Sequence, residues 1–212
     1  VTVTGVTVTV TEVQANSTPA TVTDLVQSDL AAGNNGNVIL TANGLVTLTD
    51  GSDADGVAVS ANGSGSVRID AGTGALTVNA DIVSGTGLIT LAAQQLLTLG
   101  TDVDVTTVGG SVVVSASGLF MAGTAKVAAG AGSVRVAVTN DITVGGIVAQ
   151  NVALLSTAGN ILDGGDSYVN VVAGGLLVTA GNGGVGQAGN ALETTVGTVS
   201  VVAGAAGVNL LE

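Results

Sequence analysis

GSVRIDA at residues 65–71 and GSVVVSA at residues 110–116 are two copies of the strand that decides the fold of this chain. Both begin with glycine and have aliphatic residues at their third and fifth positions. The other copies are GNVILTA from Gly36, GLITLAA from Gly87, GSVRVAV from Gly132, QNVALLS from Gln150, GGLLVTA from Gly174 and GTVSVVA from Gly197. The eight starts are 29, 22, 23, 22, 18, 24 and 23 residues apart. A repeat of this length is typical of a solenoid, whose coils are stable only when they stack on one another.

The aliphatic positions of the repeat alternate with residues that can face water, such as Arg68, Asp70 and Ser115. Alternation with a period of two, rich in β-branched residues, is the pattern of a half-buried strand. We therefore expect the third and fifth positions from the second copy onward to form a stacked core. These residues are Val67, Ile69, Ile89, Leu91, Val112, Val114, Val134, Val136, Val152, Leu154, Leu176, Val178, Val199 and Val201.

Most repeats contain two further short apolar segments between the Gly-led strands. ALTVNA from Ala75 and DITVGG from Asp141 belong to the first set, and a weaker second set includes Ile82 and Val83. Three strands and three turns in about 22 residues describe one rung of an all-β, right-handed parallel β-helix with a triangular section. The sequence thus predicts a β-solenoid over residues 36–212.

Residues 1–35 form a strand-rich segment that departs from the repeat. VTVTGVTVTVTEV at residues 1–13 alternates like a strand, and the rest of the segment is irregular. It is interpreted either as earlier rungs or a cap of the same rod, or as a strand that pairs with the open end of another subunit. Both interpretations follow because terminal rungs expose unpaired backbone groups. The candidates for intersubunit pairing are Val1, Val3, Val6, Val8 and Val10.

Composition restricts the partners. The net charge is −12, from 15 acidic and 3 basic residues, which argues against nucleic acid and anionic membrane surfaces. Although 46% of the residues are hydrophobic, no uninterrupted apolar run approaches the roughly 18–20 residues that a membrane-spanning helix needs. We interpret the hydrophobic residues as the core of a solenoid.

The inventory of reactive side chains argues against an enzyme. The chain has no His and no Cys, so it lacks catalytic triads and the common transition-metal ligands. Its only basic residues are Arg68, Lys126 and Arg135. Arg68 and Arg135 occupy the same position of strands three rungs apart, roughly 14 Å at the usual strand spacing. They are therefore too far apart to act on one substrate bond, and we expect a non-catalytic protein.

Closely spaced carboxylates give the chain its candidate metal ligands. DGSDADG at residues 50–56 places Asp50, Asp53 and Asp55 in the loop that accounts for the longest repeat spacing. Ca²⁺ takes six to eight oxygen ligands and binds weakly in extracellular modules. The alternative is a solvated loop, because the pattern of an EF-hand and the tandem nonapeptides of calcium-bound β-rolls are lacking. Asp163 with Asp166, and Asp102 with Asp104, are further candidates.

The C-terminal part of the chain resembles a known family. The elements are GNI-x-D at 159–163, GG-V-G at 183–186, N-x-L-E-T at 190–194 and the terminal G-V-x-L at 207–210. They are similar to elements in the repeats of giant filamentous-haemagglutinin-type bacterial adhesins. The resemblance covers residues 159–212 well and most of the other repeats loosely. It implies a secreted β-helical stalk on the outer surface of a Gram-negative cell, with no catalytic residues.

Two functions follow from these observations. The first is an extracellular adhesin stalk, whose partners are adjoining repeats of the same long chain and the surface of a host or neighbouring cell. The second is a subunit of a self-assembling extracellular filament or sheath, whose partners are other copies of itself. Such copies would be joined by β-strand pairing or by end-to-end pairing of rungs. Outward apolar residues such as Ile39 and Leu177 would supply lateral contacts.

Overall fold

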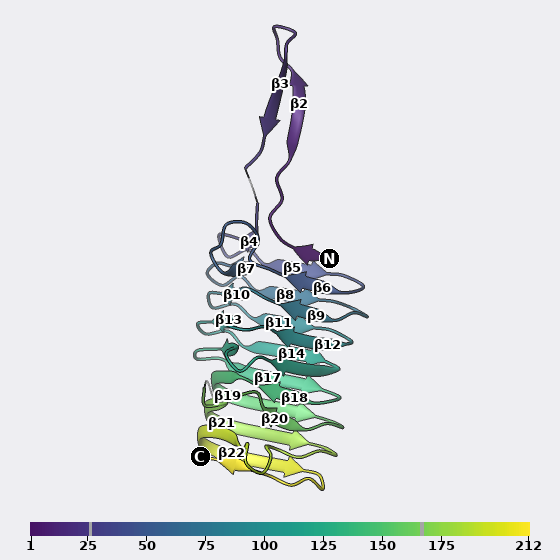
Figure 1. Cartoon of the computed structure of the whole chain (residues 1–212). Helices are drawn as coiled ribbons and strands as arrows, with labels where there is room; N and C mark the ends of the chain where they lie inside the picture. Colours follow the sequence, from purple (N-terminus) through teal and green to yellow (C-terminus); the bar gives the residue numbers. More distant parts are fainter. Residues whose placement is uncertain (26, 166–167) are drawn as a thin grey trace.

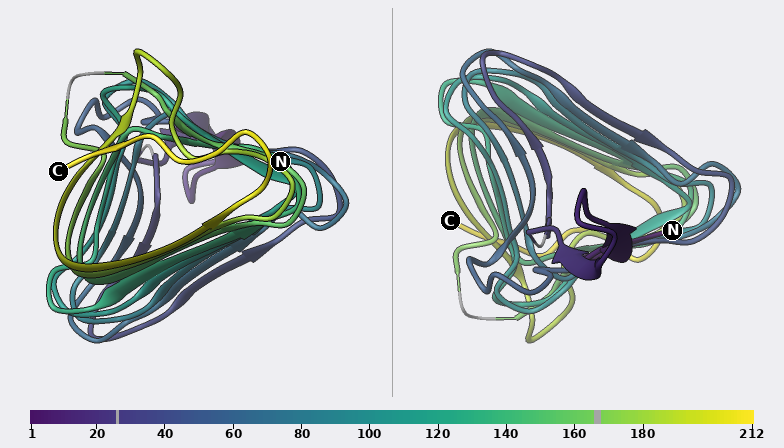
Figure 2. Two further views of the ribbon diagram at one scale, coloured as in Figure 1. Left: turned by 90° about the horizontal axis from the view of Figure 1, so that it is seen from below. Right: turned by 90° about the horizontal axis from the view of Figure 1, so that it is seen from above.

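The computed structural model describes residues 1–25, 27–165 and 168–212, and these form a rod of stacked β-strands without a helix. Successive rungs follow one another along the rod from the N-terminal to the C-terminal end (Figure 1). Viewed along the rod, the rungs enclose a triangle (Figure 2). The predicted β-helix with three short strands per rung is confirmed.

The Gly-led strands form one face of the triangle, named here the Gly-led face. It consists of β5 (Val38–Thr41), β8 (Val67–Asp70), β11 (Ile89–Ala92), β14 (Val112–Ala116), β17 (Ser133–Val138) and the C-terminal parts of β19 (Gly146–Ser156), β21 (Val171–Ala180) and β22 (Leu192–Ala203). All of them pair in parallel. The register aligns Val67 with Ile89 and Val112, and so on to Leu176 with Val199. The stacking predicted from the repeat is therefore the stacking in the structure.

The other two segments of each rung form the second and third faces. The second face consists of β1 (Thr2–Val3), β6 (Val46–Leu48), β9 (Leu76–Val78), β12 (Leu96–Leu99), β15 (Gly118–Met121), β18 (Ile142–Val144) and β20 (Ile161–Asp163). The third face consists of β4 (Leu30–Ala32), β7 (Val57–Ala61), β10 (Asp81–Ser84), β13 (Asp104–Thr107), β16 (Lys126–Ala128) and the N-terminal parts of β19, β21 and β22, with β23 (Leu210–Leu211) beside β22. In the last rungs the third and Gly-led faces are continuous, because β19, β21 and β22 run through the corner between them.

The interior of the triangle is a continuous aliphatic core. Twelve of the fourteen predicted core residues, those from Val67 to Val178, are at most 4% exposed. The prediction is wrong for Val199, which is 51% exposed, and Val201 is only partly buried. Both keep the inward register, but along this stretch β22 pairs with β21 alone, so their second side has no rung against it. Fully burying a Val or Leu side chain contributes about 1.5–3 kcal/mol.

Close approach of the backbones explains the glycine that begins the copies from Gly65 to Gly132. A Cβ on Gly110 would overlap the carbonyl oxygen of Gly87, and a Cβ on Gly87 would overlap that of Gly65. None of these three glycines has a positive φ. Here glycine is required by the contact between successive rungs and not by a left-handed turn. Elsewhere, as at Gly63 with a φ of 60°, the conformation of a corner does require it.

The N-terminal segment divides into a partial rung and a projecting hairpin. The partial rung consists of β1, which pairs with β6, and β4, which pairs with β7. Between them, β2 (Thr9–Val13) and β3 (Pro19–Thr23) form an antiparallel hairpin that extends beyond the rod (Figure 1). The solenoid therefore begins before residue 36. Neither interpretation of the sequence included the hairpin.

The pairing candidates of the N-terminal segment are distributed over both parts. Val3 is 7% exposed and aligned with Leu48, so its side chain belongs to the core of this chain, while β1 is the edge strand of its sheet. The amino group of Val1 donates a hydrogen bond to the Leu45 carbonyl oxygen at 2.7 Å. The exposed side chains are those of Val1, Val6, Val8 and Val10. Val10 is paired with Val22 inside the hairpin, so β2 already has one partner strand.

Candidate functional site

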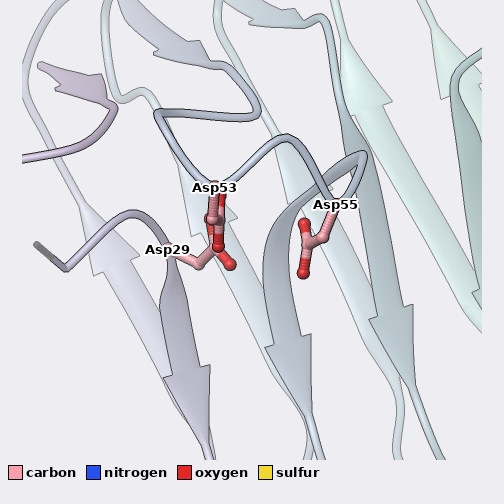
Figure 3. A group of neighbouring side chains, drawn as sticks. All are labelled: Asp29, Asp53 and Asp55. Carbon is pink, nitrogen blue, oxygen red and sulfur yellow. The ribbon is translucent and has the colours of Figure 1, made fainter.

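The predicted calcium loop lies between β6 and β7, at the corner that joins the second and third faces. Its seven-residue insertion places Asp53 and Asp55 beside Asp29, which directly precedes β4. One carboxylate oxygen of each of the three residues lies within 4.8 Å of the others (Figure 3). We call this group the Asp29 cluster. Three such oxygens are part of the ligand set that Ca²⁺ takes.

Asp50 is not part of this group. Its Oδ1 accepts a hydrogen bond from the Gly56 amide at 2.8 Å, so its carboxylate closes the loop on itself. Asp55 also accepts one such bond, from the Val57 amide at 2.8 Å, through Oδ1. The sequence missed Asp29, because it stands alone in the irregular N-terminal segment and no spacing connects it to the loop.

Burial and like charges act together on Asp29. Desolvation first, and then the negative charges of Asp53, Asp55 and Asp50, raise the pKa of Asp29 to about 6. Its Oδ1 is buried and has no hydrogen-bond partner among the described residues. A proton or a cation would relieve the repulsion within this cluster.

The same loop holds the base of the hairpin. The hydroxyl groups of Ser52 and Ser28 lie 3.1 Å apart, and the Ser52 amide donates to the Ser28 Oγ at 3.3 Å. Gly5 lies in the segment that leads into the hairpin, and Ser28 in the segment that leads out of it. Gly5 is so close to Ser52 that a Cβ at Gly5 would collide with the Ser52 side chain. One loop of the rod thus contacts both segments that connect the hairpin to the rod.

Most acidic side chains of the rod gather along this one corner. Asp81 and Asp104, in consecutive rungs, begin β10 and β13, and the Asp81 Oδ1 accepts a hydrogen bond from the Asp104 amide at 2.7 Å. Burial first, and the charge of Asp104 in addition, raise the pKa of Asp81, although the hydrogen bond opposes this. We call the corner the acidic edge; its described members are Asp29, Asp50, Asp53, Asp55, Asp81, Asp102, Asp104, Asp163 and Glu193.

The acidic edge contains one basic residue among the described residues, Lys126, which is aligned with Asp104 in the next rung. The sequence carried a signal for this edge, because these carboxylates follow the second strand of their repeats or begin the third. Of the further candidate pairs, Asp102 and Asp104 lie on the edge. Asp163 ends β20 on the same edge, while its predicted companion Asp166 lies outside the described residues.

The two arginines do not form a common site. The register of the Gly-led face places Arg68 and Arg135 in one outward row, three rungs apart, as predicted. Arg68 is paired with Asp70 in its own strand, Nη2 to Oδ2, at 2.6 Å. Arg135 lines a shallow hollow with Ala153 and Leu177. The residues between the two arginines in this row are Thr90 and Val113, neither of which carries a carboxylate.

Fold and site together define a parallel β-solenoid repeat protein with a projecting hairpin and an acidic edge. No protein-family model matches the chain, and searches of curated proteins and of solved structures found no match. Within the described part of the chain, no helix has the length and apolar character to cross a membrane. The resemblance to filamentous-haemagglutinin-type repeats accordingly stays a prediction.

Proposed function

We propose that this chain is a non-catalytic extracellular rod, a β-helical stalk segment of a large secreted bacterial adhesin at the cell surface. The observation that carries the proposal is the uninterrupted register of the Gly-led face, from Val38 to Val199. Each rung adds interstrand hydrogen bonds and a layer of aliphatic contacts, so stability grows roughly in proportion to the number of rungs. A stiff rod of this kind can hold a binding surface away from a cell.

The distribution of charge supports a structural role over a catalytic one. A hydrolase of acidic polysaccharides needs an Arg or Lys base beside acidic groups. Arg68 is bound to Asp70 on the Gly-led face, whereas the carboxylate clusters lie on the acidic edge. The partners that fit the proposal are adjoining rungs of the same solenoid and the surface of a host or neighbouring cell.

Electron microscopy of the native material tests this proposal. Isolated rods that project from the cell surface, with this segment within one continuous chain, are the expected result. An ordered lattice with one 212-residue unit per repeat would contradict the stalk and favour a self-assembling filament.

The filament has a specific observation in its favour. The hairpin exposes Val6, Val8, Val10 and Val13 and has an unpaired edge on each side. A two-stranded hairpin is marginally stable alone, and a strand from a second copy could add to either edge. Removal of residues 7–24 separates the two functions, because a filament built on the hairpin would dissociate and a stalk would keep its length in the micrographs.

A further inference from the structure

Three buried side-chain oxygens in the described part of the chain have no hydrogen-bond partner: Asp29 Oδ1, Asp163 Oδ2 and Glu193 Oε2. All three belong to the acidic edge. A buried carboxylate oxygen without a partner costs free energy, and native structures normally satisfy such atoms with a donor, a water molecule or a cation. The pattern therefore points to positively charged ligands along this edge, and it occurs at two separate places.

The second place, away from the Asp29 cluster, is organised around Asn170. This side chain is 0% exposed. Its Nδ2 donates to the Asp163 Oδ1 at 2.8 Å, and to the carbonyl oxygens of Val144 and Gly145, each at 3.1 Å. Its Oδ1 accepts from the Glu193 amide at 2.9 Å. One buried amide thus connects the residues that carry both unpartnered oxygens.

The carboxylate of Asp163 is held in place on one side only. The residue is 9% exposed, and its Oδ1 accepts hydrogen bonds from Asn170 and from the Gly165 amide, the latter at 2.8 Å. Its Oδ2 is left buried without a donor. The nearest basic residue on the edge, Lys126, is two rungs from Asn170 in the stack, roughly 10 Å at the usual strand spacing. Among the described residues it forms no salt bridge with Asp163.

We propose that Asp163 and Glu193 bind a divalent cation of the Ca²⁺ class, through the Asp163 Oδ2 and the Glu193 Oε2. Two carboxylates balance the charge of one divalent ion, and hard cations prefer oxygen ligands. Asp163 ends β20, and Glu193 stands near the start of β22 in the following rung. The ion links two consecutive rungs at a corner where the connection between faces is long. It stabilises the C-terminal rungs against local opening.

This site is separate from the Asp29 cluster. The strand order of the second face is β6, β9, β12, β15, β18 and β20. The loop after β6 and the end of β20 are thus five strand spacings apart, roughly 24 Å. Variants at one place can therefore serve as controls for the other.

Terbium luminescence tests the proposal with a built-in reporter. Tyr168 is the only tyrosine, and the chain has no tryptophan. Its ring packs against Gly146, the residue below Asn170 in the stack. Tb³⁺ bound at Asp163 and Glu193 is expected to show saturable emission when the tyrosine is excited, and Ca²⁺ should displace it.

Matched variants decide the assignment. Asp163→Asn and Glu193→Gln should each weaken Tb³⁺ binding at least tenfold, while Asp102→Asn on the same edge should leave it unchanged. Asp53→Asn should also leave the Tyr168-sensitised emission unchanged. Circular dichroism checks that each variant folds. If Asp163→Asn does not fold, the decision rests on Glu193→Gln. Ca²⁺ should raise the melting temperature of the wild type, and it should raise that of Glu193→Gln by less.

Three results would overturn the proposal. The first is a wild-type protein without saturable, Ca²⁺-displaceable emission. The second is unchanged Tb³⁺ affinity in the folded variants of Asp163 and Glu193. The third is loss of the emission in Asp53→Asn, which would assign the signal to the Asp29 cluster.

Discussion

The body of the solenoid and its N-terminal hairpin use the same kinds of residue with opposite results. In the body, Val and Ile at alternate positions are almost completely buried, whereas Val6, Val8 and Val10, which lead into and lie in β2, are exposed although they alternate with threonines as regularly. The difference is the number of neighbours. A body strand has a parallel neighbour on each side and two other faces opposite it, while β2 has only β3. Alternation therefore specifies a strand, and only repetition specifies burial.

The largest effect is expected in the core of the body. Val114 is 0% exposed, and Val114→Asp would bury a charge among aliphatic side chains, at a cost of about 4 kcal/mol or more. Ser115→Asp, on the exposed side of the same strand, should cost little. Thermal unfolding followed by circular dichroism should show a fall of roughly 10 °C or more for the first variant only. Equal falls in both variants would contradict the assignment of inward and outward positions.

A smaller effect is expected where consecutive backbones touch. Gly110→Ala forces a methyl group against the Gly87 carbonyl oxygen, and we expect a loss of about 1–3 kcal/mol. Gly109→Ala is the matched control, since the nearest atom to its Cβ is the Thr86 Cγ2 at 4.0 Å. Chemical denaturation measures both. Equal stability of the two variants would show that the rungs can separate at no cost.

Calcium binding at the root of the hairpin can be measured separately from binding at Asp163 and Glu193. If Asp29, Asp53 and Asp55 bind Ca²⁺ as weakly as extracellular modules do, 10 mM of the ion stabilises the site by about 1.4–2.7 kcal/mol. Hydrogen exchange of residues 49–56 should then slow on addition of Ca²⁺, and Asp53→Asn should abolish the slowing. Asp50→Asn is the comparison for Asp53→Asn. The Asp50 carboxylate accepts a hydrogen bond from the Gly56 amide and lies outside the cluster. Equal slowing in wild type and Asp53→Asn would leave the loop without a calcium site.

The pH dependence of the same loop follows from the raised pKa of Asp29, which is about 6 against 3.8 for the free side chain. The folded loop binds this proton more tightly than the unfolded chain does. The stabilisation of the folded loop by this proton is therefore complete below about pH 4 and is lost as the pH rises through 6. After correction for the base-catalysed intrinsic exchange rate, the amides of residues 49–56 in a chelator should be less protected at pH 7.5 than at pH 5. Asp29→Asn should remove most of this difference, and persistence of the full difference would assign it to another group.

The sequence predicted what repetition encodes and missed what single contacts create. The stacking of Val67, Ile89 and Val112 could be predicted, because each rung repeats the same contacts. Asp29 could not, since its position beside Asp53 depends on where a hairpin returns to the rod. The same holds for Asn170, which has three hydrogen bonds to residues in neighbouring rungs, far away in the chain. The exposure of Val199 was missed because the repeat pattern shows which way a side chain points and not what covers it.

The smallest effect is expected from removing the hairpin itself. Replacement of residues 7–24 by a short Gly-Ser linker keeps β1 and β4, which cover the first rung, and removes no buried side chain. The melting temperature of the rod should change by less than about 2 °C, since surface changes usually stay within about 0.5 kcal/mol. Removal of residues 1–35 is the contrasting variant, because it also uncovers Val46 and Leu48, both 0% exposed. A large loss already in the shorter deletion would mean that the hairpin, and not β1 and β4, protects the N-terminal end of the core.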